Sequence, residues 1–298
     1  MDLGRTTVPA TWFFIDERRQ ADGWSYRVVA SDGDRHGAIG PVWSRHRVHA
    51  PAPRRMPACD VRDLATNLAT SMDETWFRPL VELAVWKATI LEPTDSLGEV
   101  EAYRSVLDPR IALPDELEVL LKVSAQTDVE GIEETRPVAY DALNGFASWS
   151  DVEQLAVQRP HLRWIEDPMP PEKWPAQPCC EVPIVAGENL CDPGAVAVLC
   201  ERAANLSFAA NLELSRLGPV GFIDSVAVAT AAGKRAIAHG HLPLETALIV
   251  SMCCTPVMVE LNLAHLQQRC GPRAARVLLD RGSTPFGPEA FTSERVRP

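Results

Sequence analysis

The pattern of hydrophobic and polar positions changes near residue 100. Before that point, residues 26–40 read as two strands joined by an Asp-Gly turn at Asp32-Gly33, which predicts a β-hairpin. Apolar residues recur at helical spacing over 60–72 and 76–90, which predicts two helices. Antiparallel strands followed by helices are typical of a small α+β domain. We therefore expect residues 1–99 to form such a domain.

From residue 100 onward, short apolar runs alternate with stretches of helical spacing. Most of these runs end in a polar residue with Pro or Gly close behind, as buried parallel strands do where they leave the core. Strands are expected over 100–107, 137–140, 162–165, 182–185, 206–212, 236–239 and 256–260. Helices are expected between them over 150–157, 193–204, 226–232 and 244–252. The alternation predicts an α/β barrel or doubly wound sheet with its site at the strand ends.

One stretch, 118–124, supports two interpretations. It is apolar enough to be the second strand of a barrel, in which case Lys122 lies near its end. It is also rich in good helix formers and follows Pro114, so a helix is an equal competitor. The pattern alone leaves both open.

Three acidic residues follow three successive predicted strands. Asp141, Glu166 and Glu188 lie 25 and 22 residues apart, close to the length of one strand-plus-helix unit. At the carboxyl ends of neighbouring strands they would share one rim and repel one another. A hard divalent cation with oxygen ligands, most simply Mg²⁺, would relieve that repulsion.

Four further polar residues at predicted strand ends are candidates for acid–base chemistry. They are Lys122, Glu213, His239 and Glu260. A metal-bound substrate carboxylate makes the neighbouring C–H more acidic, and a lysine beside a cation would have a lowered pKa and act as a base. Glu213 would hydrogen-bond His239 and raise its basicity. Lys122 and His239 on opposite faces of a substrate would fit either racemisation or β-elimination of water.

The composition and net charge of the chain argue against several classes of binding partner. The chain has 298 residues and a formal net charge of −11, which argues against nucleic acid and anionic membranes. It contains no apolar run of membrane-spanning length and no signal-peptide pattern, so we expect a cytoplasmic protein. Its eight cysteines include no C-x-x-C pair, which argues against a zinc site and for reduced thiols.

Several of these segments together resemble the enolase superfamily, in particular its mandelate racemase and muconate lactonizing branch. They are WIEDP at 164–168, VPIVAGEN at 182–189, SRLGPVG at 215–221 and GKRAIAHG at 233–240. The stretch VELAVW at 81–86 and the Asp32-Gly33 hairpin resemble the capping domain of that family. The resemblance therefore runs through most of the chain.

The resemblance implies a modified TIM-like (β/α)7β barrel over 100–285, an N-terminal α+β capping domain over 1–99, and a tail over 286–298 that returns to the cap. It implies Mg²⁺ bound by the three acids and removal of a proton next to a carboxylate. It also implies that Lys122 and His239 are the acid–base groups, that Glu213 pairs with His239, and that Glu260 contacts the enolate.

The chain departs from the family pattern at four points. Leu120 stands where the family has a first lysine, Glu213 stands where an aspartate is usual, and Lys87 replaces another aspartate. The spacing between Asp141 and Asn144 is one residue longer than usual.

The expected function is thus a Mg²⁺-dependent lyase that dehydrates an acid sugar through an enediolate. The alternatives are a racemase or epimerase of a 2-hydroxy or amino carboxylate, and a non-catalytic relative that binds a carboxylate ligand. We also expect a small-molecule carboxylate substrate and a homo-oligomer.

Overall fold

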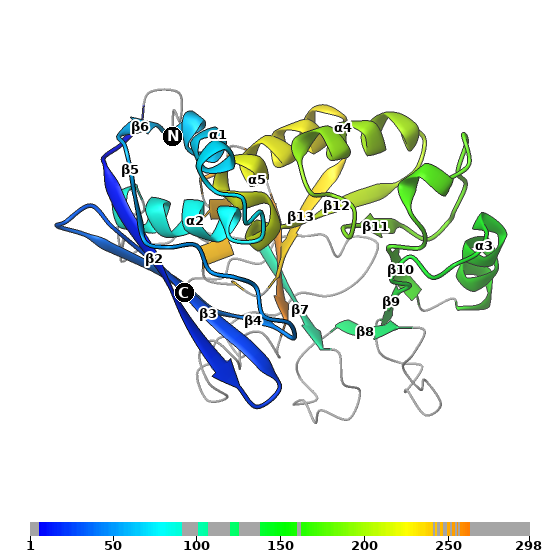
Figure 1. Ribbon diagram of the computed structural model, residues 1–298. Helices are drawn as coiled ribbons and strands as arrows, with labels where there is room; N and C mark the ends of the chain where they lie inside the picture. Colours follow the sequence, from blue (N-terminus) through cyan, green and yellow to red (C-terminus); the bar gives the residue numbers. More distant parts are fainter. Residues whose placement is uncertain are drawn as a thin grey trace. The chain divides into compact units, whose positions relative to one another are not determined.

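The computed structural model describes most of the chain (Figure 1). The described residues are 6–90, 101–106, 120–124, 138–159, 162–240, 242, 245–246, 249–250, 252–253, 255 and 257–262. The predicted tail over 286–298 lies outside them. The chain divides into two compact units, one formed by Met1–Asp95 with Leu214–Ile223 and the other by Ser96–Glu213 with Asp224–Pro298.

The first unit is built on a four-stranded antiparallel sheet in the order β4-β3-β2-β5. Its strands are β2 (Thr11–Gln20), β3 (Gly23–Ser31), β4 (His36–Ser44) and β5 (Arg54–Met56), and a separate short pair joins β1 (Thr7–Val8) to β6 (Cys59–Asp60). The predicted hairpin is present, because β3 and β4 pair across the turn at Asp32 and Gly33. The Asp32 carboxylate accepts the backbone N–H groups of Asp34 and Arg35, which fixes the turn.

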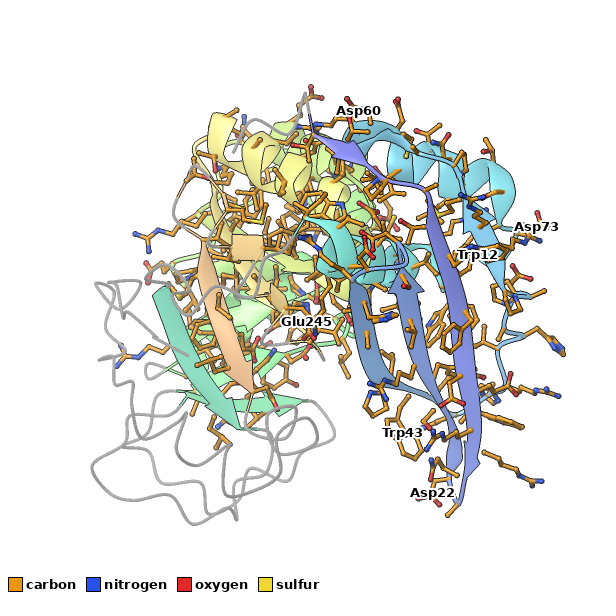
Figure 2. The ribbon with its side chains drawn as sticks, turned by 90° about the vertical axis from the view of Figure 1, so that its left-hand side faces the viewer. Trp12, Asp22, Trp43, Asp60, Asp73 and Glu245 are labelled. Atoms are coloured by element: carbon orange, nitrogen blue, oxygen red, sulfur yellow. The ribbon has the colours of Figure 1, made fainter. Side chains whose placement is uncertain are left out.

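The helices α1 (Val61–Ser71) and α2 (Arg78–Thr89) complete this unit. Helix α2 contacts β3 and β4, and side chains of alternate strand positions such as Phe13, Val28 and Ile39 are fully buried. The intervening positions point away from that core, so Trp12, Phe14 and Trp43 are exposed (Figure 2). The alternation matches a sheet with one packed face and one open face.

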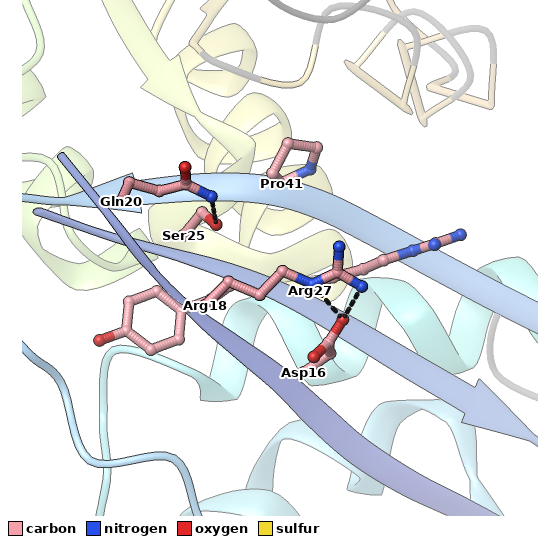
Figure 3. Close-up of a pocket in the computed structure, with 7 residues that line it drawn as sticks. Asp16, Arg18, Gln20, Ser25, Arg27 and Pro41 are labelled. Atoms are coloured by element: carbon pink, nitrogen blue, oxygen red, sulfur yellow. Dashed lines mark hydrogen bonds and ion pairs between the residues drawn. The ribbon is translucent and has the colours of Figure 1, made fainter.

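A pocket of about 240 Å³ lies on this sheet (Figure 3). It is lined by Asp16, Arg18, Gln20, Ser25, Tyr26, Arg27 and Pro41. The Arg18 guanidinium donates two hydrogen bonds to Asp16 Oδ2, at 3.0 and 2.8 Å, and Gln20 Nε2 donates to Ser25 Oγ at 3.1 Å. Because these lining groups bind one another, we assign the pocket no role.

The second unit is a closed barrel of parallel strands. Its strands are β7 (Glu101–Val106), β8 (Leu120–Ser124), β9 (Val138–Asp141), β10 (Leu162–Glu166), β11 (Ile184–Ala186), β12 (Phe208–Glu213), β13 (Arg235–His239) and β14 (Met258–Asn262). The barrel closes because β14 pairs with β7 over five residues. Strand β8 settles the two interpretations of 118–124, since it pairs with both β7 and β9 and carries Lys122.

A cluster of buried side chains forms the core of the barrel. Its members come from seven of the strands: Tyr103, Ala139, Trp164, Val185, Ala209, Ile237 and Met258. The rings of Tyr103 and Trp164 meet edge to face at 5.4 Å between centroids. This packed cluster supports the strands on which the predicted site residues lie.

Helices follow the barrel strands as the sequence predicts, with one correction. Helices α3 (Trp149–Gln158) and α4 (Pro193–Arg202) match their predictions, and a short 3₁₀ turn, η2, spans Pro171–Lys173. Helix α5 runs over Leu214–Ala231, so the prediction of a helix over 226–232 was too short at its start. Among the described residues, no helix is long and apolar enough to cross a membrane.

The first part of α5 contains a kink that explains this error. Gly218 has φ 70, outside the helical region, and Pro219 follows it. The buried carboxylate of Glu82 on α2 accepts the backbone N–H of Val220 at 2.9 Å and satisfies a group that the kink frees. A side chain at position 218 would collide with Glu82, so glycine is required there.

Candidate functional site at the carboxyl ends of the barrel strands

The predicted site residues lie at the carboxyl ends of the barrel strands. Asp141, Glu166, Glu213 and His239 are the last residues of β9, β10, β12 and β13, Lys122 and Glu260 lie on β8 and β14, and Glu188 follows β11. The strand register places Asp141 beside Glu166 and Glu213 beside His239. Because the strands are parallel, all seven residues belong to one rim of one barrel.

Lys122 joins two acids from different strands. Its Nζ lies 2.8 Å from Glu166 Oε2 and 3.5 Å from Glu260 Oε2, and each of the three side chains is 7% exposed or less. The second oxygen of Glu166 accepts a hydrogen bond from Asn211 Nδ2 at 2.9 Å. The centre of the rim is therefore a buried lysine held by two carboxylates.

Glu260 is itself held from the neighbouring first strand of the barrel. Tyr103 Oη donates to Glu260 Oε2 at 3.0 Å and Ser105 Oγ donates to Oε1 at 2.5 Å. Asn262 Nδ2 donates to Ser105 Oγ at 3.1 Å. Together these contacts fix the carboxylate that faces Lys122.

The sequence analysis missed these supporting residues. Tyr103, Ser105 and Asn211 are polar residues inside predicted strands, Asn262 lies two residues beyond the last predicted strand, and all four are buried. The available signal was their spacing, because 103 and 105, and likewise 260 and 262, lie two apart and so point to the same face of a strand.

Electrostatics fixes the charge of the central lysine. Burial alone would lower the pKa of Lys122, but Glu166 and Glu260 outweigh it and raise the pKa far above its usual value. Burial likewise favours a raised pKa for Glu260, but Lys122, His239 and the hydroxyls of Ser105 and Tyr103 lower it overall. The sequence analysis expected a cation to lower the pKa of Lys122, whereas the two neighbouring acids raise it. Lys122 is thus an ammonium group at neutral pH.

The three predicted metal ligands lie within electrostatic reach of one another. Burial and the charge of Glu166 raise the pKa of Asp141 to about 6, Glu188 raises it further, and Lys122 and the Leu143 N–H oppose them. Asp141 is half-buried, Glu166 is buried and Glu188 is exposed. Within the described part of the chain, however, no group of three or more His, Cys, Asp or Glu side chains is arranged to hold a metal ion.

The donor chemistry of these acids still fits Mg²⁺. All three offer carboxylate oxygens, which this ion prefers. Burial is the main cause of the raised pKa of Asp141, and the charges of Glu166 and Glu188 add to it, which a bound cation would offset. Asp151 accepts the backbone N–H of Ser148 and caps helix α3, so its carboxylate has a structural role.

His239 and Glu213 form the second predicted pair. They are register partners on β12 and β13, and both are half-buried. Gly240, with φ 126, follows the histidine, and a side chain there would lie 3.0 Å from Glu213 Cγ. His239 lies close enough to Glu260 to contribute to the lowered pKa of that carboxyl group.

The fold and this rim define a parallel α/β barrel with a separate α+β unit and an acidic site at its strand ends. No family model and no curated protein matches the chain. Solved structures do match it: an L-talarate dehydratase from Polaromonas sp. JS666, complexed with Mg and L-glucarate, is 16% identical over 86% of each chain, with a TM-score of 0.61. A racemase from Streptomyces coelicolor A3(2) with bound magnesium is 16% identical over 83% of this chain and 90% of that one, with a TM-score of 0.55.

A third match is an enolase from Bradyrhizobium complexed with magnesium and mandelic acid. It is 18% identical over 86% of this chain and 88% of that one, with a TM-score of 0.53. These structural neighbours are members of the mandelate racemase and muconate lactonizing branch of the enolase superfamily. The chain has the fold of that branch, which confirms at the level of fold the resemblance drawn from the motifs.

Proposed function

We propose that the protein is a Mg²⁺-dependent lyase that removes the proton next to a carboxylate and dehydrates an acid sugar. The observation that carries this proposal is the unequal pair of groups at the rim. Lys122 is held as an ammonium ion by Glu166 and Glu260, whereas His239 is a half-buried imidazole in register with Glu213. In this proposal Lys122 keeps its proton and His239 is the group that exchanges one.

Asp141, Glu166 and Glu188 would hold the metal ion. A bound Mg²⁺ would neutralise the substrate carboxylate and the negative charge that develops when the α-proton leaves. The charges of Glu166 and Glu188 that act on Asp141 support this assignment, because a cation bound by the three acids would offset their mutual repulsion.

His239 would take the α-proton and return it to the departing hydroxyl group, which leaves as water. The resulting enol rearranges to a 2-keto acid, and His239 ends the cycle as it began. Glu213 would orient the imidazole. Lys122 would stay protonated and donate hydrogen bonds to substrate oxygens.

This division of roles favours dehydration over racemisation. A two-base racemase must leave each base neutral in one direction of turnover, and Glu260, which is not a predicted metal ligand, favours the charged form of Lys122 from 3.5 Å. Dehydration requires one proton-exchanging group on one face of the substrate. The dehydratase complexed with L-glucarate gives the same direction for the substrate class, an acid sugar.

A second candidate is a non-catalytic carboxylate-binding protein. It is favoured by one observation, that both carboxylate oxygens of Glu166 already face protein groups, Lys122 and Asn211. In that case the Lys122 ammonium itself would bind the ligand carboxylate.

The test is to incubate the purified protein with Mg²⁺ and a panel of acid sugars in D₂O. Formation of 2-keto acid supports dehydration, and recovery of substrate that carries deuterium without keto acid supports racemisation instead. Absence of both, together with no Mg²⁺ binding by calorimetry, would establish the non-catalytic alternative. His239→Asn and a metal-chelated sample serve as controls, and each should abolish turnover.

Two further expectations stay predictions. Cytoplasmic location awaits fractionation of cells that produce the protein. Homo-oligomer formation awaits sedimentation of the purified chain.

A further inference from the structure

Asp167 is a buried acid next to the predicted metal ligand Glu166, and nothing in the reaction above uses it. Its side chain is 6% exposed. Its Oδ1 accepts the backbone N–H groups of Gly187 at 2.7 Å and Glu188 at 3.1 Å. The carboxylate of one rim loop thus holds the backbone of the next loop, at the residue predicted to bind Mg²⁺.

The backbone of Asp167 makes contacts on both sides. Its N–H donates to Val185 O at 2.8 Å, and its carbonyl accepts the N–H of Asn144 at 2.7 Å. The preceding carbonyl, of Glu166, accepts the N–H of Ala142 at 2.8 Å. Backbone hydrogen bonding between β9, β10 and β11 therefore continues past the ends of β9 and β10, directly after the predicted ligands Asp141 and Glu166.

The conformation of Asp167 is unfavourable by itself. Its φ is 42, in the left-handed region that non-glycine residues rarely adopt. Its carboxylate is also buried beside the charge of Glu166. Strained and crowded residues of this kind persist where the surrounding structure requires them, commonly at functional sites.

The far side of the loop is equally constrained. A side chain at Gly187 would lie 3.0 Å from the carbonyl oxygen of Asn211, whose amide in turn donates to Glu166. The Gly187–Glu188 backbone therefore lies between Asp167, directly after β10, and Asn211 on β12.

We propose that Asp167 is a positioning residue that sets the distance between Glu188 and the acids Asp141 and Glu166, and thereby the affinity for Mg²⁺. The inference rests on the proposed function, because it takes Mg²⁺ as the ion that these three acids bind. Partners that orient metal ligands commonly change metal affinity by about 10- to 100-fold when they are removed.

The experiment compares Asp167→Ala, Asp167→Ser and Asp167→Asn with Asp151→Ala. Asp151 is a matched control, because its carboxylate also accepts a backbone N–H but caps helix α3. Mg²⁺ dissociation constants are measured by calorimetry on variants whose circular dichroism matches the wild type. We expect Asp167→Ala and Asp167→Ser to weaken Mg²⁺ binding by about 10- to 100-fold. Asp167→Asn, which keeps the Oδ1 acceptor, and Asp151→Ala should bind Mg²⁺ as the wild type does.

Amide hydrogen exchange at Gly187 and Glu188, in metal-free protein, tests the positioning role without any metal. We expect these two amides to exchange faster in Asp167→Ala and Asp167→Ser than in the wild type and in Asp167→Asn. If wild-type protein binds no Mg²⁺, the proposed function fails while the exchange data still decide whether Asp167 holds the loop. Wild-type exchange rates or wild-type Mg²⁺ affinity in both Asp167→Ala and Asp167→Ser would overturn the inference, and Asp167→Ser covers the case in which the alanine variant does not fold.

Discussion

The buried lysine at the centre of the rim makes a quantitative prediction about stability. Lys122→Met keeps the length of the side chain but removes the ammonium that lies 2.8 Å from Glu166 and 3.5 Å from Glu260. At an effective dielectric constant of about 20, each contact corresponds to about 5–6 kcal/mol of Coulomb attraction before desolvation is subtracted. Removing one member of a buried ion pair costs about 3–5 kcal/mol, since the partner is left as an unpaired charge. We expect a loss of that size in the free energy of unfolding at pH 7.5.

The sign of the pH dependence sharpens the prediction. In the wild type the pKa of Glu260 is lowered, so its contribution to stability is present above the unfolded value of about 4.3 and is lost as the pH falls further. Without Lys122, burial dominates and the pKa of Glu260 rises above the unfolded value. The folded variant then takes up a proton that the unfolded chain does not. Its deficit relative to the wild type should therefore shrink between pH 7.5 and pH 5.

Urea denaturation of metal-free protein, followed by circular dichroism at both pH values, measures this. Lys173→Met is the control, because Lys173 is exposed and its loss should change stability by less than about 0.5 kcal/mol. If Lys122→Met is as stable as the wild type at pH 7.5, or if its deficit is the same at pH 5, the ion-pair reasoning is wrong.

Three further predictions follow from other parts of the structure. His239→Asn should lower kcat by at least about 100-fold with an unchanged circular dichroism spectrum, as expected for a general base, and an unchanged rate would exclude His239 from the reaction. Gly218→Ala should lower the free energy of unfolding by about 1–2 kcal/mol or more, because a φ of 70° is left-handed and the new methyl group meets Glu82. A variant whose denaturation midpoint equals or exceeds that of the wild type would contradict this. Burial and the charge of Glu166 raise the pKa of Asp141 to about 6 and of Asp167 to about 7, so the folded chain binds extra protons as the pH falls. Calorimetry of the metal-free protein should therefore give a Tm that rises as the pH falls from 8 to 5.5. Saturating Mg²⁺, which needs ionised ligands, should oppose that rise, and a Tm independent of pH without metal would refute the crowding of acids.

The barrel could be predicted from the sequence because its strands are buried on both faces. Such strands are continuous apolar runs, and the residue that leaves the core is polar, so Asp141, Glu166 and His239 marked the ends of β9, β10 and β13. The same acids then suggested a common rim. The apolar periodicity and the polar residue at the end of each strand are local features, which can be read from a single sequence.

Lys122 could not be placed by local features. The stretch around it contains good helix formers, and its identity as β8 depends on pairing with β7 and β9, which are distant in sequence. The start of α5 was missed for the opposite reason, because Gly218 and Pro219 indicate a break although Glu82 stabilises the kink. In both cases tertiary contacts override the intrinsic preference of the segment.

The polar network within the barrel was also beyond prediction from sequence. Tyr103 and Ser105 become partners of Glu260 when the first and last strands pair, and these residues are separated by more than 150 positions. Asn211 similarly reaches Glu166 across an intervening strand. A pattern can show that such residues share a strand face, but the barrel closure decides what they meet.

The pairing of β14 with β7 has a consequence for how the protein is made. A ribosome releases residues 258–262 long after residues 101–105, so the two strands that close the barrel are separated by almost the whole of that unit during translation. Lys122 and Glu166 can meet earlier, but Glu260 reaches them only when the final strand docks. Its hydroxyl partners on β7 have been synthesised by then. Before the final strand docks, Lys122 therefore has one counter-ion. Its second counter-ion, Glu260, is added when β14 pairs with β7 and the barrel closes.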